Sequence, residues 1–179
     1  MRHCAAIFLM SCALAFGIRG AHAEDGRSVD CGDIAMKFTG PGFKVTCMDF
    51  SDHTALSGGT RVELLSAQAD DEQQILNALV IRALGSIYLK RRGMEEDVRS
   101  YFSEENVRDW QQTDNVAGFE FAQYTGKTDE GGPAKCIAFR RQINRRYEGF
   151  GRIVVGFGCA THGREQLIET LKMLTAPGG

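Results

Sequence analysis

Short runs in which apolar and polar residues alternate recur along this chain. Alternation with a period of two is typical of a strand that buries one face. Residues 33–38 and 43–50 are two such runs on either side of Thr39-Gly40-Pro41-Gly42, and this arrangement predicts a hairpin. Residues 60–68, which follow Gly58-Gly59, predict a third strand.

The second half of the chain contains three further strand patterns, in residues 117–126, 136–141 and 151–160. The first two alternate, whereas residues 151–160 are apolar almost throughout, which is typical of a central strand covered on both faces. A polar segment joins the last two runs, and together they predict a second hairpin.

A longer segment, residues 70–92, has the period of an amphipathic helix. Asp70 and Gln73 have the spacing of a capping box, and Gly93 is a suitable residue to end the helix. The apolar stripe of this predicted helix consists of Leu76, Val80, Ala83 and Ile87.

Two shorter helices are predicted as well. Residues 162–175 follow Thr161, a possible N-cap, and place leucines and an isoleucine on one face. Residues 94–110 are less regular, and we expect a short helix followed by a strand.

These elements predict an α+β fold. Helices with one apolar stripe need a sheet to bury against, and hairpin connections make that sheet mainly antiparallel. We therefore expect about six strands, packed by a long middle helix and a C-terminal helix, in one domain over residues 24–179.

The first 23 residues have the character of a signal peptide. A short apolar stretch follows Arg2 and His3 and ends in Ala21-His22-Ala23, a small-x-small cleavage pattern. A retained membrane anchor and a lipoprotein attached at Cys12 are the alternatives, and both fit less well than simple export. The predicted location is the bacterial periplasm or the secreted fraction, with no stable membrane span after cleavage.

The net charge argues against some partners. Removing the leader takes away two arginines and no acidic residue, which changes the formal charge from −2 to −4. A nucleic-acid-binding surface usually needs a basic domain, so no nucleic-acid partner is expected.

The mature chain would keep four cysteines, Cys31, Cys47, Cys136 and Cys159. An even number in an exported chain predicts two disulfides. Opposed residues of a hairpin are symmetric about its turn. Cys136 and Cys159 are centred on Tyr147-Glu148, and Cys31 and Cys47 on a point close to the Gly-Pro-Gly turn. This symmetry predicts the pairs Cys31–Cys47 and Cys136–Cys159.

Motifs for catalysis are not found in the sequence. There is no G-x-S-x-G elbow, no C-x-x-C, no H-E-x-x-H and no complete phosphate loop. The histidines of the mature chain, His53 and His162, are far apart, and the acidic runs 95–97 and 104–105 are expected to form solvated faces. We therefore predict no catalytic residue, no metal and no cofactor.

Arginines are the remaining candidates for a binding site. Arg140, Arg141, Arg145 and Arg146 lie within seven residues, and Arg152 follows on the return strand. Arginine suits recognition of carboxylate or phosphate, whereas charge at a hairpin tip also protects a sheet from unwanted pairing. Because side chains alternate, Arg140 and Arg141 are expected on opposite faces.

The order of elements resembles the PsbP-like group of exported α/β proteins. The features that carry the resemblance are the "FTGPGFKV" hairpin, the long middle helix, the strands ending in "GFGRIVVGFGCA" and the closing helix "REQLIETLKMLT". The chain departs from that group in its four cysteines and in Phe43, where such hairpins often carry tryptophan. The resemblance implies an accessory or assembly role without catalysis.

Two functions follow as hypotheses. The first is an exported accessory or binding protein that contacts another exported or envelope protein. The second is a small periplasmic enzyme, hydrolase-like, whose carboxylate or histidine site the sequence does not assemble.

Overall fold

The computed structural model describes residues 26–50, 59–71, 73–85, 87–102, 107–127, 132–146, 149–161 and 163–176, without the side chains of residues 101, 102 and 146. The predicted signal peptide lies outside these residues. The elements are β1 (Arg27–Val29), β2 (Lys37–Phe38), β3 (Phe43–Asp49), β4 (Thr60–Ala69), β5 (Gln74–Ala83), α1 (Met94–Phe102), β6 (Arg108–Val116), β7 (Phe119–Lys127), β8 (Pro133–Arg146), β9 (Gly149–Ala160), α2 (Arg164–Lys172) and β10 (Leu174–Thr175).

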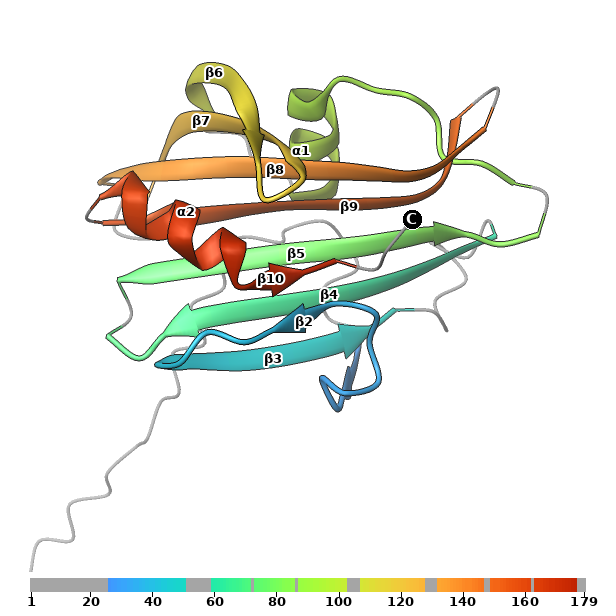
Figure 1. Ribbon diagram of the computed structural model, residues 1–179, viewed down its shortest axis with the longest axis horizontal. Coiled ribbons are helices and arrows are strands. Elements are labelled where there is room, and N and C mark those ends of the chain that lie inside the picture. The colour runs from blue at the N-terminus through green and yellow to red at the C-terminus, as the bar shows by residue number, and fades with distance from the viewer. Residues whose placement is uncertain are drawn as a thin grey trace, which may run out of the picture.

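Eight of the strands form one sheet in the order β1-β3-β4-β5-β9-β8-β7-β6 (Figure 1). Every neighbouring pair is antiparallel, as the sequence predicted. A second sheet contains only β2 and β10. No helix in the described part of the chain is long and apolar enough to cross a membrane.

The predicted α+β fold is wrong, because strand makes up 61% and helix only 13% of the structure. The described part of residues 70–92 contains no helix, and most of it forms β5 in the middle of the sheet. Residues Gln74 to Ile81 are buried without interruption. A strand covered on both faces is apolar at most positions, and such a run also satisfies a helical period.

The predicted N-terminal hairpin is also wrong. β2 and β3 flank the Gly-Pro-Gly turn, but they do not pair with each other. β3 pairs with β1 and β4, whereas β2 pairs with β10, where Phe38 lies opposite Leu174. The turn therefore takes the chain from the small sheet, which contains β2, to the large sheet, which contains β3.

Other predicted elements are confirmed. β4, β7, β8 and β9 form where the alternating runs predicted strands, α1 and β6 follow in the expected order, and β9 is a central strand between β5 and β8. The C-terminal helix is α2, although its N-cap position is Gly163 and not Thr161.

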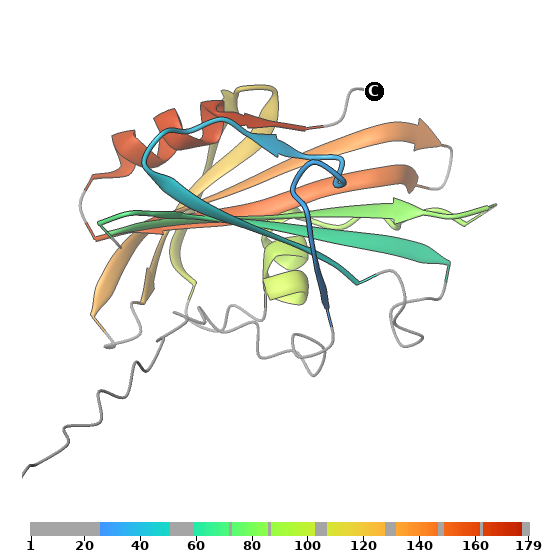
Figure 2. The ribbon, with the colours of Figure 1, turned by 90° about the horizontal axis from the view of Figure 1, so that it is seen from below.

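Each face of the sheet has its own core and its own helix. One face carries Ile153, Val155 and Phe157 of β9 and is covered by α1. The other carries Val154 and Ala160 and is covered by α2, β10 and β2. Figure 2 shows α1 and α2 on opposite sides of the sheet.

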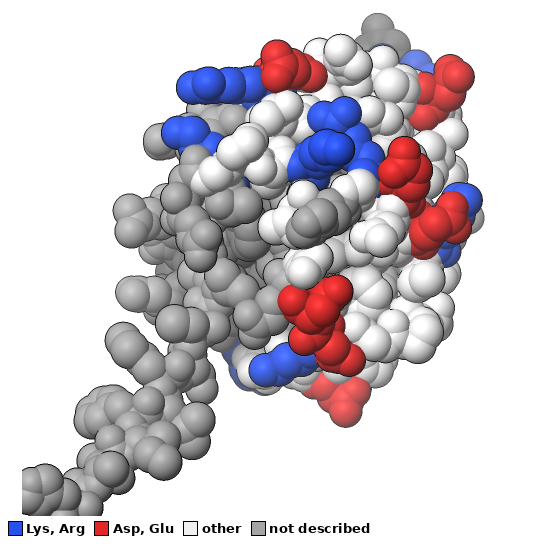
Figure 3. All heavy atoms as spheres, turned by 90° about the vertical axis from the view of Figure 1, so that its left-hand side faces the viewer, with Lys and Arg blue, Asp and Glu red and all other residues white. Residues whose placement is uncertain are grey.

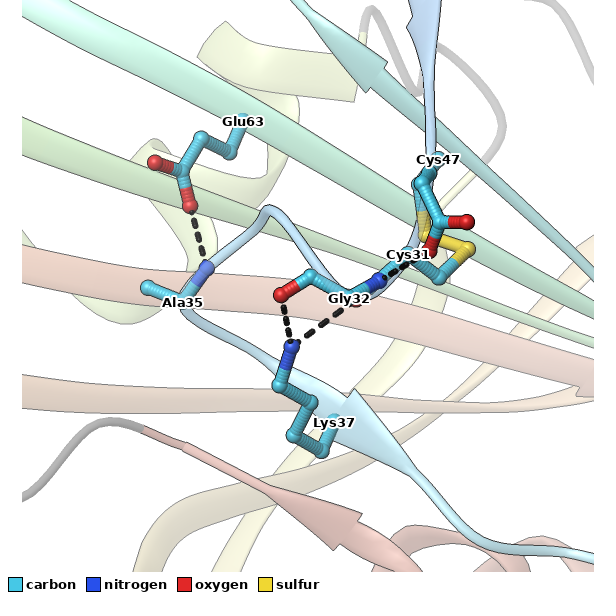
Figure 4. Close-up of a disulfide and its surroundings, with 7 residues drawn as sticks. Cys31, Gly32, Ala35, Lys37, Cys47 and Glu63 are labelled. Atoms are coloured by element: carbon cyan, nitrogen blue, oxygen red, sulfur yellow. Dashed lines mark hydrogen bonds between the residues drawn. A yellow bond between two sulfur atoms is a disulfide. The ribbon is translucent and has the colours of Figure 1, made fainter.

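Both predicted disulfides are present. Cys136 and Cys159 are direct partners in the register of β8 and β9, with Cα atoms 4.1 Å apart, as hairpin symmetry predicted. The Cys31–Cys47 bond forms for another reason. β1 pairs with β3 so that Val29 lies opposite Cys47, and Cys31 follows two residues later (Figure 4).

Candidate anion-binding site

The structure separates the five arginines that the sequence singled out. Arg140 lies on the face covered by α1, and Arg141 on the opposite face, as alternation predicted. Arg145 shares a cavity with Arg140, whereas Arg152 lies on the other face. The side chain of Arg146 is outside the described residues.

A cavity of about 260 Å³ gathers four guanidinium groups. Its lining, called the arginine cavity below, consists of Arg91, Arg92, Arg140, Gln142, Arg145 and Phe150. The first two come from the segment between β5 and α1, the next three from β8, and Phe150 from the start of β9. Residues about 50 positions apart in sequence therefore meet here.

A backbone bridge holds the two parts of the cavity together. The N–H of Leu89 donates to the carbonyl of Phe150 over 2.8 Å, and the N–H of Phe150 donates back over 3.0 Å. The two segments approach so closely that a Cβ on Gly149 would lie 2.1 Å from the carbonyl oxygen of Leu89. Glycine is thus required at the position where Arg91 and Arg92 are brought beside β8.

Asn144 explains why Arg145 faces the same cavity as Arg140. Strict alternation would place an odd-numbered residue of β8 on the face opposite Arg140. Asn144 has a φ of 57°, in the left-handed region that asparagine tolerates better than most residues. The twist at this residue turns Arg145 to the face of Gln142 and Phe150.

Arg140 stabilises the wall of the cavity, because its guanidinium is already bound by protein groups. Its Nη1 donates to Asp97 Oδ2 over 2.8 Å and to the carbonyl of Arg92 over 2.7 Å. Its Nε donates to Glu120 Oε2 over 3.1 Å. The side chain is only 8% exposed, so these protein groups occupy it and fix the backbone of Arg92.

Asp97 is fully buried beneath Arg140. Burial raises the pKa of its carboxyl above the ordinary value, although the hydrogen bond and charge of Arg140 oppose the change. Its Oδ1 has no hydrogen-bond partner in the described part of the chain. The acidic run 95–97 was predicted to be a solvated face. This holds for Glu95 and Glu96, which pair with Arg99 and Arg92, but not for Asp97.

Two guanidinium groups of the cavity remain without a carboxylate among the described residues. Arg91 lies over the ring of Phe150, with 5.5 Å from Cζ to the ring centroid. Arg145 is exposed and makes no ion pair with a described residue. Arg92 is only weakly neutralised, with 3.8 Å between its Nε and Glu96 Oε1. The cavity therefore has excess positive charge suited to a carboxylate, phosphate or sulfate group.

Three exposed apolar residues, called the apolar patch below, precede Arg91 and Arg92 of the cavity on the same segment. They are Leu84, Ile87 and Tyr88, whose exposed fractions are 47%, 40% and 37%. Among the described residues, these are the large hydrophobic residues classed as exposed. Tyr88 reaches toward β9, because a Cβ on Gly149 would lie 3.0 Å from its ring.

The opposite end of the molecule has different chemistry. A hollow of about 580 Å³ lies between α2 and the β4–β5 turn, and its lining includes Asp70, Asp71, Glu165 and Glu169. Figure 3 faces that end and shows separate acidic side chains along its right side and lower edge. Among the described residues, no three His, Cys, Asp or Glu side chains are grouped to hold a metal ion. His53 and His162 lie outside the described residues, so the structure does not place them.

Sequence reasoning missed Arg91, Arg92, Gln142 and Phe150. The run "KRRG" of residues 90–93 was the available signal, but it was assigned to the end of the middle helix, where basic residues need no ligand.

Comparison of the chain with protein-family models, with curated proteins and with solved structures finds no significant match. The resemblance to the PsbP-like group thus stays an expectation from element order, and the middle helix among those elements is a strand here.

Proposed function

We propose that this protein is an exported accessory protein that binds an acidic segment of another exported or envelope protein, without catalysing a reaction. The proposed binding surface consists of the arginine cavity and the apolar patch of Leu84, Ile87 and Tyr88, which precedes Arg91 on the chain.

The observation that carries the proposal is the position of these two features on one segment. Exposed apolar residues beside arginine and tyrosine are the composition of binding hot spots between proteins. Here residues 84–92 supply the patch and two of the four cavity arginines. The Leu89–Phe150 bridge holds the segment on the sheet, which lowers the entropy lost on binding.

The charge of the cavity indicates the partner's chemistry. Arg91 and Arg145 lack a carboxylate partner among the described residues, and an aspartate or glutamate side chain would supply one. The volume of about 260 Å³ is below the usual range for a drug-sized ligand but leaves room for one acidic side chain. An apolar residue next to that acid in the partner would contact Leu84 or Ile87.

Two observations are compatible with export of the protein. Two disulfides are compatible with an oxidising compartment, and the first residues have the pattern of a cleaved leader. Intact-mass measurement of the protein recovered from the periplasm should give a chain that starts at Glu24 and carries two disulfides. A full-length chain, or one with a lipid on Cys12, would contradict simple export.

Photo-crosslinking tests the binding surface. A photoreactive phenylalanine at Ile87 is placed in the wild-type chain, in Arg91→Glu/Arg145→Glu and in the control Arg108→Glu, which changes an exposed arginine of β6. Each purified protein is irradiated in envelope extract. We expect a crosslinked protein with the wild type and the control that is lost with the double variant.

The crosslink should also decrease when a synthetic acidic and apolar peptide is added in excess. Equal crosslinks from the wild type and the double variant, with unchanged circular dichroism, would remove the arginine cavity from the function.

A further inference from the structure

Three arginines lie side by side on the sheet face that the arginine cavity does not use. Arg61 of β4 is the direct register partner of Arg82 of β5, which is in turn the register partner of Arg152 of β9. Direct partners on neighbouring strands have Cβ atoms about 4.5–5.5 Å apart and project to the same side. These residues form the arginine row.

Such a row is unfavourable by itself, because like charges directly opposite each other destabilise a sheet. The fourth position of the row is Ile143, and Arg141 lies diagonal to Arg152 on the same face. The row is therefore extended by a further cation and not by an acid.

The two carboxylates near the row, those of Glu63 and Asp49, already interact with other groups of the protein, mainly with Arg61 at one end of the row. Glu63 Oε1 lies 3.2 Å from Arg61 Nε, and its Oε2 accepts the backbone N–H of Ala35 over 2.7 Å (Figure 4). Asp49 Oδ2 lies 3.3 Å from Arg61 and 3.7 Å from Arg27. Arg82 has no ion pair with any described residue.

Arg152 has the least favourable environment of the three. Its Nε is buried and lacks a hydrogen-bond partner in the described part of the chain. Burial lowers the pKa of its guanidinium from the ordinary value and the charge of Arg82 lowers it further, while Glu63 opposes both. Arg82 and Arg152 thus have no carboxylate in direct contact among the described residues, and the two carboxylates near the row pair with Arg61 at its end.

We propose that Arg61, Arg82 and Arg152 bind a ligand that carries two or more linked phosphate or sulfate groups. Planar guanidinium groups at the spacing of neighbouring strands can each donate two parallel hydrogen bonds to an oxyanion. A single phosphate can satisfy only part of a row that spans two strand spacings, about 10 Å. A chain of linked groups can contact Arg82 and both of its neighbours.

This site is distinct from the surface proposed for the partner protein. The row lies on the face of Val154, and the arginine cavity lies on the face of Ile153. Each site can therefore be removed without the other.

Isothermal titration calorimetry with three probes tests the row: inorganic phosphate, tripolyphosphate and a sulfated heparin disaccharide. We expect at least one of the two multivalent probes to bind about tenfold or more tightly than phosphate, because additional charge-assisted hydrogen bonds form. Comparison of the two distinguishes a phosphate chain from a sulfated sugar.

The variant Arg82→Gln should weaken that binding about tenfold or more, by loss of the central guanidinium. Without ligand, the same variant should unfold at a higher urea concentration than the wild type, because repulsion within the row decreases. Arg108→Gln, a matched loss of one exposed arginine elsewhere, should leave the affinity unchanged. Arg145→Gln tests whether the probe binds in the arginine cavity instead.

Three results would overturn the proposal. The first is that neither multivalent probe binds more tightly than phosphate. The second is an equal loss of affinity in Arg82→Gln and Arg108→Gln, which indicates general charge attraction. The third is a loss in Arg145→Gln alone, which assigns the ligand to the arginine cavity.

Discussion

Arg140→Met would leave the carboxylate of Asp97 in the interior without the guanidinium that now binds it. The side chain of Asp97 is 1% exposed, so water cannot replace the lost partner. Removing one partner of a buried ion pair typically costs about 3–5 kcal/mol, because the other charge stays buried and uncompensated. We expect a loss in that range near neutral pH.

A second substitution identifies the source of this loss. In Arg140→Met/Asp97→Asn the uncompensated charge is gone, and more than half of the lost stability should return. In Arg140→Met/Glu120→Gln little should return, because the carboxylate of Glu120 is 34% exposed and water can hydrate it once Arg140 is gone.

The loss should also depend on pH in a definite direction. Burial raises the pKa of Asp97 above the unfolded value of 3.8, so the folded state takes up this proton more readily than the unfolded state. The contribution of Asp97 to stability therefore falls as the pH rises from 3.8 through the folded pKa. Removing Arg140 removes two interactions that lower this pKa, so it rises further in Arg140→Met. The variant should thus lose less stability at pH 5 than at pH 7.5.

Urea unfolding provides the assay. Trp110 is the single tryptophan of the chain and stacks on the buried Tyr124 with 5.7 Å between ring centroids, so its fluorescence reports the folded sheet. Midpoints are compared at equal slope. Equal losses at both pH values, or no recovery on adding Asp97→Asn, would refute the uncompensated buried carboxylate as the cause.

Three further predictions concern the fold. Cys136→Ala/Cys159→Ala should cost about 3.4 kcal/mol in urea unfolding without reductant, from the entropy of the open loop of 23 residues, and an unchanged midpoint would contradict this. Gly156→Ala should cost about 3 kcal/mol, because its Cβ would lie 2.3 Å from a carbonyl oxygen of β5, whereas Gly93→Ala, with open space around it, should change the melting temperature little. Leu171→Ala should cost about 2–5 kcal/mol, because this residue is fully buried between α2 and the sheet, and a smaller loss would mean that α2 is not docked there.

The N-terminal disulfide shows how a correct pairing can rest on the wrong geometry. Symmetry about the Gly-Pro-Gly turn predicted Cys31–Cys47, yet the hairpin behind that argument does not exist. Pairing of β1 with β3 brings Cys31 close to Cys47 instead, and β1 has only three residues, too few to show a recognisable period. The pair Cys136–Cys159 follows directly from the register of one hairpin, so local sequence was sufficient there.

The candidate site was predictable only in part. The cluster of arginines on β8 was visible, and so was the opposite direction of Arg140 and Arg141. Arg91, Arg82 and Arg61 were not linked to it, because no local pattern connects them with β8 or β9. Pairing of β5 with β4 and β9 makes Arg82 a neighbour of both other members of the row.

The sequence by itself determined the alternating strands, the C-terminal helix and the second disulfide, because each depends on residues close together along the chain. Only the tertiary structure decided that residues 74–83 form a strand, since a helix and a doubly covered strand have the same apolar pattern there. It also decided which arginines share a cavity and which share a row. Those groupings depend on strand order, and strand order is set by contacts between distant segments.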